Sequence, residues 1–210
     1  MKSFRSVTSQ AVVLDRADVD TDQIIPKQFL KRIERTGYGE FLFYDWRQDP
    51  AFELNRAEYA GATILVAGRN FGCGSSREHA AWAIQDYGFE VVVAPSFGDI
   101  FASNAVQIGL VTIALPEEQV RGLMGERELT VDLETLTIVG DEGEAITFDF
   151  DPFRRHKLLN GLDDIGLTLE HEGDIAAFEA ARTGGIATTA LPSSPQRGRA
   201  KPGHVQGRAG

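Results

Sequence analysis

The middle of the chain alternates between short apolar segments and longer amphipathic ones, and this alternation limits the folds open to it. Three segments have the length and β-branched content of buried strands: 63–66 (TILV), 91–94 (VVVA) and 110–115 (LVTIAL). Helical segments at about 76–87 and 97–108 separate them. A β-α-β-α-β order needs crossover connections, which join parallel strands. We therefore expect an α/β fold with a mainly parallel central sheet.

Further elements are expected on both sides of this unit. An acidic loop at 18–22 and a short helix beginning at Pro26 follow the first strand. A strand is also predicted at 11–14. Three strands after the parallel unit, at 129–133, 136–139 and 145–150, are expected to be antiparallel. Short helices are expected near 154–159 and 174–182. The sequence thus predicts one α/β domain over residues 1–182, with an extra β-layer and flanking helices.

Residues 183–210 differ from the rest in composition. They contain four basic residues, no acidic residue, six Gly and three Pro. Their large aliphatic side chains are Ile186, Leu191 and Val205, too few to bury the apolar surface that would offset the entropy of ordering. We expect a disordered tail. Its basic charge leaves open a contact with nucleic acid or with an acidic partner.

Composition excludes several classes of protein. Cys73 is the only cysteine among 210 residues, which excludes an internal disulfide, a zinc site built on several cysteines and an iron–sulfur cluster held by this chain alone. The formal net charge is −10, so a phosphate backbone would repel the chain. No apolar run is long enough to cross a membrane, and the N-terminus lacks the apolar segment of a signal peptide. We expect a cytoplasmic protein that binds neither nucleic acid nor membrane.

Residues 68–84 (GRNFGCGSSREHAAWAI) place a glycine-rich turn between a buried strand and a helix N-terminus. Gly72 and Gly74 let the backbone approach a ligand closely, and the unpaired N–H groups of the helix favour an anion. A P-loop would need a lysine after its last glycine, where Ser75 stands, and a dinucleotide fingerprint would need a third glycine, where Arg77 stands. The turn is therefore predicted to bind an anion without either phosphate motif.

The polar residues of this turn allow two interpretations. Arg77 can hold a carboxylate through two parallel hydrogen bonds. Ser75, beside a guanidinium and backbone N–H groups, has surroundings that would stabilise an alkoxide, as a serine base without a histidine partner requires. Alternatively, Ser75 and Glu78 form a capping box, with Ser75 as the N-cap of the helix. The histidines have no ligand-like spacing, so no metal site is predicted.

The stretch GSSREH at 74–79 is similar to the signature of the swivelling domain of the aconitase superfamily. Three further stretches agree in order and spacing: 19–29 (VDTDQIIPKQF), 96–110 (SFGDIFASNAVQIGL) and 152–169 (PFRRHKLLNGLDDIGLTL). The first and last narrow the resemblance to the free-standing small subunits of 3-isopropylmalate dehydratase (isopropylmalate isomerase). The resemblance covers about residues 4–182 and implies a swivelling β/β/α domain.

The resemblance implies a hydro-lyase of leucine biosynthesis that interconverts 2-isopropylmalate and 3-isopropylmalate through 2-isopropylmaleate. In this family a [4Fe–4S] cluster with one open iron lies on a separate large subunit. A large-subunit partner, a small dicarboxylate substrate and no cofactor on this chain are therefore implied. Two alternatives remain open: a small subunit for a related hydroxyacid, of citraconate/methylmalate or homoaconitate type, and a non-catalytic anion-binding module.

Position within the shared motifs implies individual roles. Ser75 is implied as the base that removes the α-proton, while Ser76 and Arg77 are implied as ligands of the substrate carboxylate. Asp22 corresponds to the acidic residue that orients the active-site cations. Lys31 lies in the loop where related enzymes select the substrate's side group, so it is a further candidate contact.

Overall fold

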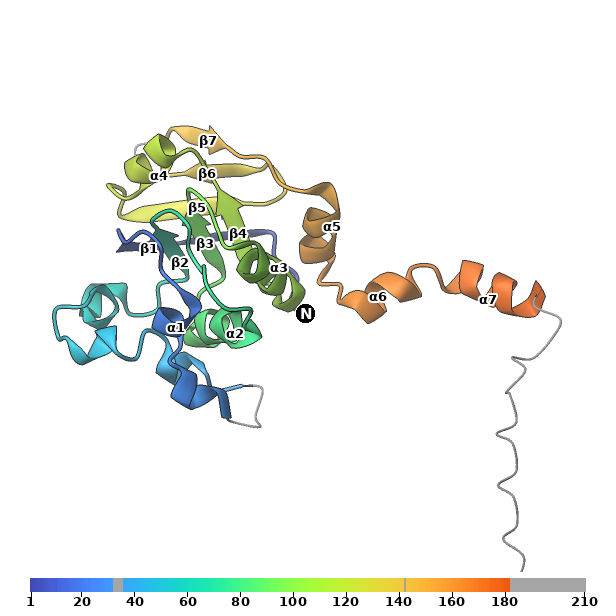
Figure 1. Ribbon diagram of the computed structural model, residues 1–210. Helices are drawn as coiled ribbons and strands as arrows, with labels where there is room; N and C mark the ends of the chain where they lie inside the picture. The colour runs from blue at the N-terminus through green and yellow to red at the C-terminus, as the bar shows by residue number, and fades with distance from the viewer. Residues whose placement is uncertain (32–35, 142, 182–210) are drawn as a thin grey trace, which may run out of the picture. The chain divides into compact units, whose positions relative to one another are not determined.

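The computed structural model describes residues 1–31, 36–141 and 143–181, and it divides into two units, Met1–Glu170 and His171–Gly210 (Figure 1). The strands of the described residues form one sheet of the first unit, in the order β4-β3-β2-β1-β5-β6-β7. They are Ser6–Leu14 (β1), Ile64–Ala67 (β2), Val91–Ala94 (β3), Val111–Ala114 (β4), Glu128–Asp132 (β5), Thr137–Val139 (β6) and Ala145–Thr147 (β7).

Six α-helices of the described residues belong to the first unit and one to the second. Those of the first unit are Thr21–Ile24 (α1), Glu78–Tyr87 (α2), Asp99–Ile108 (α3), Glu117–Leu123 (α4), Pro152–Asn160 (α5) and Asp164–Leu169 (α6). The second unit contains Glu172–Ala181 (α7). Short 3-10 segments lie at Lys27–Lys31, Gly39–Phe41, Trp46–Gln48, Glu53–Asn55 and Ala57–Tyr59.

Strands β1 to β4 form the parallel half of the sheet. Ile64 of β2 pairs with Ala11 of β1 and Val91 of β3, and Val91 pairs in turn with Val111 of β4. All residues of β2 and β3 are buried, as expected of parallel strands covered on both faces. The predicted parallel centre and its two connecting helices are confirmed.

Strand β1 joins the two halves of the sheet. Its residues from Ala11 to Leu14 run parallel to β2, while those from Ser6 to Gln10 pair antiparallel with β5. The antiparallel strands β6 and β7 follow. The strands expected as an extra β-layer therefore continue the same sheet through β1. The sequence predicted only residues 11–14 of β1, because side chains in its first half alternate between exposed and half-buried.

The sheet separates two apolar clusters, and alternate residues of β1, β2 and β3 contribute to one cluster or the other. Leu65 and Val92 face the cluster that α2, α3 and residues 38–54 cover. Ile64 and Val91 face the cluster that α4, α5 and the antiparallel strands cover. Burial of each large aliphatic side chain stabilises the folded chain by about 1.5–3 kcal/mol relative to leaving it exposed. Both clusters lie wholly within the first unit.

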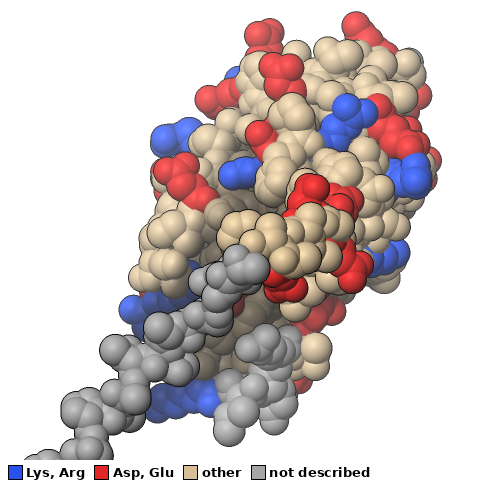
Figure 2. Space-filling model, turned by 90° about the vertical axis from the view of Figure 1, so that its right-hand side faces the viewer, with Lys and Arg blue, Asp and Glu red and all other residues tan. Residues whose placement is uncertain are grey.

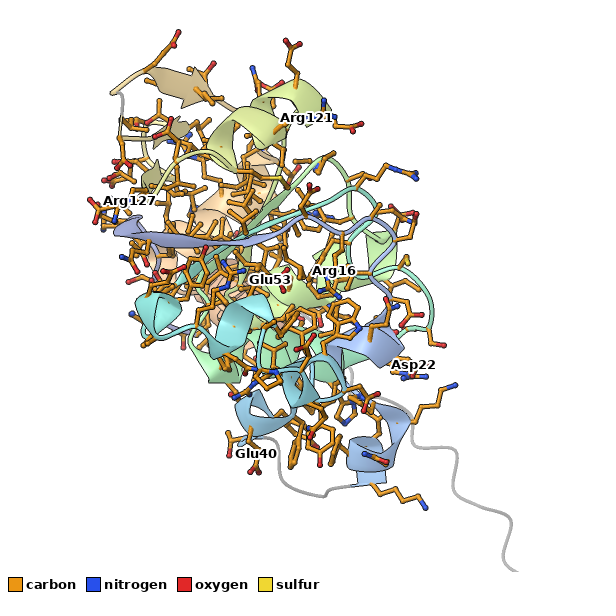
Figure 3. All side chains as sticks on the ribbon, turned by 90° about the vertical axis from the view of Figure 1, so that its left-hand side faces the viewer. Arg16, Asp22, Glu40, Glu53, Arg121 and Arg127 are labelled. Atoms are coloured by element: carbon orange, nitrogen blue, oxygen red, sulfur yellow. The ribbon has the colours of Figure 1, made fainter. Side chains whose placement is uncertain are left out.

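An aromatic segment with little regular structure, residues 38–59, is fixed to the first cluster. Tyr38 and Phe43 are fully buried there. The guanidinium of Arg16, just beyond the end of β1, lies 4.5 Å from the ring centre of Trp46, and its Nη2 atom is 3.5 Å from an oxygen of Glu53 (Figure 3). This cation–π contact and ion pair hold the segment against the carboxyl end of β1.

The structure differs from the expected elements at short helices. The predicted acidic loop at 18–22 contains the start of α1, and neither α4 nor α6 was predicted. The helix expected at Pro26 is a 3-10 segment that begins one residue later. No helix of the described residues is long and apolar enough to cross a membrane. The predicted tail, 183–210, lies outside the described residues, so the domain boundary at 182 stays a prediction.

Candidate functional site

The glycine-rich turn follows β2 at the carboxyl edge of the parallel strands. It lies between the loops that follow the neighbouring strands β1 and β3. An isolated bridge pairs Asp20 with Cys73 on one side, and another pairs Phe71 with Phe97 on the other. Three loops, distant in sequence, therefore meet at one edge, where α/β sheets commonly bind ligands.

Close packing explains the first glycine of the turn. Gly72 has a φ of +73°, and a Cβ atom there would lie 2.3 Å from the ring of Phe101 on α3. The neighbouring loop approaches equally closely, because a Cβ on Gly98 would lie 2.5 Å from the carbonyl oxygen of Gly72. The turn can follow this path only because residues 72 and 98 are glycines and have no side chain.

The predicted capping box is wrong. Helix α2 begins at Glu78, and its N-cap is Arg77, which has an extended backbone (φ −140°, ψ 114°) and makes no side-chain cap hydrogen bond. Ser75 lies two residues before the N-cap and is exposed. Among the side-chain hydrogen bonds of the described residues, none involves the hydroxyl of Ser75. The Ser75 hydroxyl therefore does not cap helix α2.

Thr21 fixes the backbone around Ser75. Its side chain is only 2% exposed, and its hydroxyl donates a hydrogen bond to the carbonyl oxygen of Ser75 (3.1 Å). Its backbone N–H donates to the carbonyl oxygen of Cys73 (2.9 Å). A capping box between Asp20 and Gln23, with bonds of 2.8 and 2.9 Å, holds α1 in place beneath these contacts.

Asp22 and Arg77 form an ion pair across the turn. Arg77 Nη1 donates to one carboxylate oxygen of Asp22, which Figure 3 shows on α1, and Lys27 Nζ lies 3.2 Å from the other. The Arg77 side chain is 12% exposed. Partial burial acts to raise the pKa of Asp22, but hydrogen bonds from Arg77 and Lys27 outweigh it and hold the pKa below its usual value. Asp22 is therefore a carboxylate at neutral pH.

The predicted site residues fall into two groups. Ser75, Ser76 and Arg77 are consecutive in the turn, and Asp22 is bonded to Arg77. Lys31 is exposed at the end of its 3-10 segment, and no hydrogen bond or ion pair of the described residues joins it to the turn. The structure brings the first four together and does not bring Lys31 to them. Their roles in catalysis and binding stay predictions.

Sequence reasoning missed Lys27 and Thr21, although both lie in the stretch VDTDQIIPKQF. A lysine in a motif already assigned an acidic site residue could have indicated the Lys27 contact. Nothing in the pattern indicated that Thr21 would reach Ser75, because 54 residues separate the two. Such contacts depend on how the loops meet.

The other reactive side chains nearby have surroundings that keep them neutral. Burial, with the charges of Asp20 and Asp18, raises the pKa of the Cys73 thiol. Burial also lowers the pKa of His79, whose ring packs 5.2 Å from that of Tyr38 and 4.8 Å from that of Trp82. The thiol is thus protonated and the imidazole neutral at pH 7.

The chain's own residues do not fit an iron–sulfur cluster. Among the described residues, no group of three or more His, Cys, Asp or Glu side chains could hold a metal ion. Cys73 is the only cysteine of the whole sequence, and a [4Fe–4S] cluster needs several thiolates.

Comparisons with known proteins identify the family. The model of the aconitase C-terminal domain matches residues 1–118, and that of the C-terminal domain of the 3-isopropylmalate dehydratase small subunit matches residues 164–184. A 3-isopropylmalate dehydratase small subunit from Rubrobacter xylanophilus is 56% identical over 188 residues, covering 87% of this chain and 96% of that protein. One from Bacillus subtilis is 53% identical over 194 residues, covering 87% and 98%. The chain belongs to the 3-isopropylmalate dehydratase small-subunit family.

A solved structure agrees with this family assignment. The crystal structure of 3-isopropylmalate dehydratase (leuD) from Methanocaldococcus jannaschii superposes with a TM-score of 0.63 and is 27% identical in sequence. The match covers 83% of this chain and 99% of that one. The family resemblance predicted from the GSSREH and DTDQIIP stretches is confirmed.

Proposed function

We propose that the chain is the small subunit of a 3-isopropylmalate dehydratase, a hydro-lyase of leucine biosynthesis in the cytoplasm that works with a large subunit as a heterodimer. Its reaction interconverts 2-isopropylmalate and 3-isopropylmalate through 2-isopropylmaleate. The family supports the reaction class. The observation that carries the proposal is the turn itself, where the Ser75 hydroxyl is free of the helix cap and Arg77 is fixed beside it by Asp22.

Arg77 binds a substrate carboxylate. A guanidinium has five N–H donors, and Asp22 accepts from one nitrogen of Arg77 only, so the rest of the planar group can grip a second carboxylate. The ion pair also fixes the orientation of the guanidinium before substrate arrives, which lowers the entropy lost on binding. Ser76, exposed beside Arg77, adds a hydroxyl donor for the same carboxylate.

Ser75 removes the proton from the carbon next to that carboxylate. As an alkoxide, Oγ accepts the proton, the C–H electron pair becomes the double bond of 2-isopropylmaleate, and the hydroxyl leaves from the adjacent carbon. The Arg77 guanidinium and the unpaired N–H groups at the start of α2 stabilise the negative charge on Oγ. The proton returns from Ser75 when water adds with the opposite regiochemistry.

The departing hydroxide needs a Lewis acid, which a [4Fe–4S] cluster on the large subunit would supply. This chain has one cysteine and cannot hold that cluster, so two chains must meet at the turn. Lys31 stays a proposed contact for the substrate's side group. Its loop would distinguish isopropylmalate from substrates of the citraconate/methylmalate or homoaconitate type.

The test is co-expression with the large subunit, followed by an anaerobic assay of 2-isopropylmaleate absorbance formed from 3-isopropylmalate. Activity should require both chains. Ser75→Ala should lose activity by roughly 10²–10⁴-fold, the usual contribution of general acid–base catalysis, and should still bind the large subunit. Full turnover by Ser75→Ala would remove Ser75 as the base. A complex active only on citraconate would change the substrate, and the absence of any complex would favour a non-catalytic anion-binding module.

A further inference from the structure

Helix α6 is held in place without burying a side chain. None of its residues is buried. Of its three large aliphatic residues, Leu167 is half-buried, while Ile165 and Leu169 are 71% and 59% exposed. These two residues are four apart, so they lie on the same side of the helix. A helix this short has little stability of its own and normally depends on the apolar face that it buries. In α6 that face is turned outward.

Polar contacts fix both ends of α6 to α5. Lys157, itself only 5% exposed, donates from Nζ to Asp164 Oδ1 at 2.6 Å. His156 Nε2 lies 3.2 Å from both carboxylate oxygens of Glu170, directly after the last turn of α6. Leu158 of α5 is buried in the second apolar cluster. The outward position of Ile165 and Leu169 is thus built into the first unit, where both side chains are available to apolar groups of a partner.

A groove of about 380 Å³ lies between α2, which follows the turn, and the residues at the start of α6. One wall is a face of α2 that carries Glu78, Trp82 and Gln85, and Glu78 directly follows Arg77 in the chain. Another wall is formed by Lys157 with Asp163 and Asp164 at the start of α6. A partner that covers the turn therefore has this groove next to it, beginning at Glu78 and ending at the start of α6.

The charge of the groove indicates which kind of partner it can bind. Its charged lining residues are Glu78, Asp86, Asp163, Asp164 and Lys157. The single ammonium among them is already paired with Asp164, so the groove is acidic. On the upper part of the face that Figure 2 shows, Asp and Glu likewise gather in groups. An anionic dicarboxylate would be repelled, and so would a second copy of a chain with a net charge of −10.

We propose that the groove and the outward face of α6 form a docking surface for the large subunit, which presents aliphatic side chains to Ile165 and Leu169 and basic side chains to the groove. The inference rests on the proposed function, because that function requires a second chain at the Ser75 turn. The model of the family's C-terminal domain begins its match at Asp164, the first residue of α6.

The test compares two double variants of the full-length chain. Ile165→Lys/Leu169→Lys places two positive charges on the proposed surface, where they meet both the apolar and the basic part of the partner. Ala145→Lys/Thr147→Lys places the same charges on exposed positions of β7, an edge strand at one end of the sheet, where lysine is well tolerated. Affinity for the purified large subunit is measured anaerobically, together with thermal unfolding and kcat at saturating large subunit.

The α6 variant should weaken binding by at least roughly 100-fold, since each aliphatic side chain buried at an interface contributes about tenfold or more. Its thermal unfolding and its kcat at saturating partner should match wild type, and the β7 variant should match wild type throughout. Salt should weaken wild-type binding, because the groove attracts basic groups.

Wild-type affinity in the α6 variant would overturn the inference while leaving the proposed function intact. Self-association of the wild-type chain that is lost in the α6 variant would also overturn the inference, because the surface would then bind a second copy of this chain. If the α6 variant unfolded at a lower temperature but bound the large subunit with unchanged affinity, the α6 surface would instead be assigned to contacts within the chain. Failure of the wild-type chain to bind any large subunit would instead refute the proposed function, and Ser75→Ala, which should bind normally, separates the two failures.

Discussion

At the scale of single residues, the site depends on side chains that never need to touch substrate. Thr21 holds the carbonyl of Ser75, and Asp22 holds the guanidinium of Arg77. The two are neighbours in sequence on α1, so one short helix positions both the proposed base and the proposed carboxylate ligand. Small shifts of α1 would move both groups relative to a bound substrate.

Thr21→Val tests this positioning, because valine keeps the shape of threonine and removes the hydroxyl. We expect kcat of the assembled enzyme to fall roughly 10- to 100-fold, since a displacement of about 1 Å can cost that much, with KM changed less than about twofold. The free energy of unfolding of the valine variant should be lower than that of wild type by about 1 kcal/mol, the usual contribution of one hydrogen bond. Thr21→Ser retains the hydroxyl and should restore kcat. An unchanged kcat in the valine variant would leave Thr21 with a structural role alone.

At the scale of elements, the sequence predicts what local patterns determine. Strands β2 and β3 were recognised because their residues are continuously apolar, as burial on both faces requires, and β4 because its residues are apolar or β-branched. Helix α1 was missed although Asp20 and Gln23 have the spacing of a capping box, because its four residues lie within an acidic stretch. Helix α6 was missed because it buries nothing and is fixed by ion pairs to α5.

The same contrast holds for the candidate site. The motif placed Ser75 beside Arg77, since the two are nearly adjacent in the chain. The choice between a helix cap and a free hydroxyl at Ser75 could not be made from the pattern, because Ser-x-x-Glu fits both. The structure decides it, because the N-cap of α2 is the extended Arg77, while Thr21 binds the carbonyl oxygen of Ser75.

The turn also offers a matched pair of glycines. Gly72→Ala combines a positive φ with a Cβ 2.3 Å from the Phe101 ring, and we expect it to destabilise the chain by roughly 2–4 kcal/mol. Gly74→Ala has a similar φ of +92° but its nearest contact is 3.4 Å, so only the backbone strain of about 1–2 kcal/mol remains. Urea unfolding of both variants measures the difference. Equal losses would show that the Phe101 contact does not restrict the turn.

At the scale of the whole molecule, the first unit contains everything that the fold and the proposed site require. The parallel half of its sheet presents the turn, and the antiparallel half extends the same sheet through β1. The proposed reaction also needs a Lewis acid for the departing hydroxide, and the single cysteine of the chain cannot hold a [4Fe–4S] cluster that would supply it. The acidic groove and α6 lie on this same unit, so the proposed partner surface is built from its residues alone.

A chain truncated after Glu170 tests whether the first unit is stable without the residues that follow it. Both apolar clusters are built from residues between Phe4 and Leu158, and the His156–Glu170 pair is retained. Residues 171–181 are exposed throughout, so their loss removes no core contact. Thermal unfolding should therefore shift by less than about 3 °C, since surface changes typically stay within about 0.5 kcal/mol. A fall of roughly 10 °C or more would mean that the segment after Glu170 completes the core and that the domain extends toward the predicted boundary at 182.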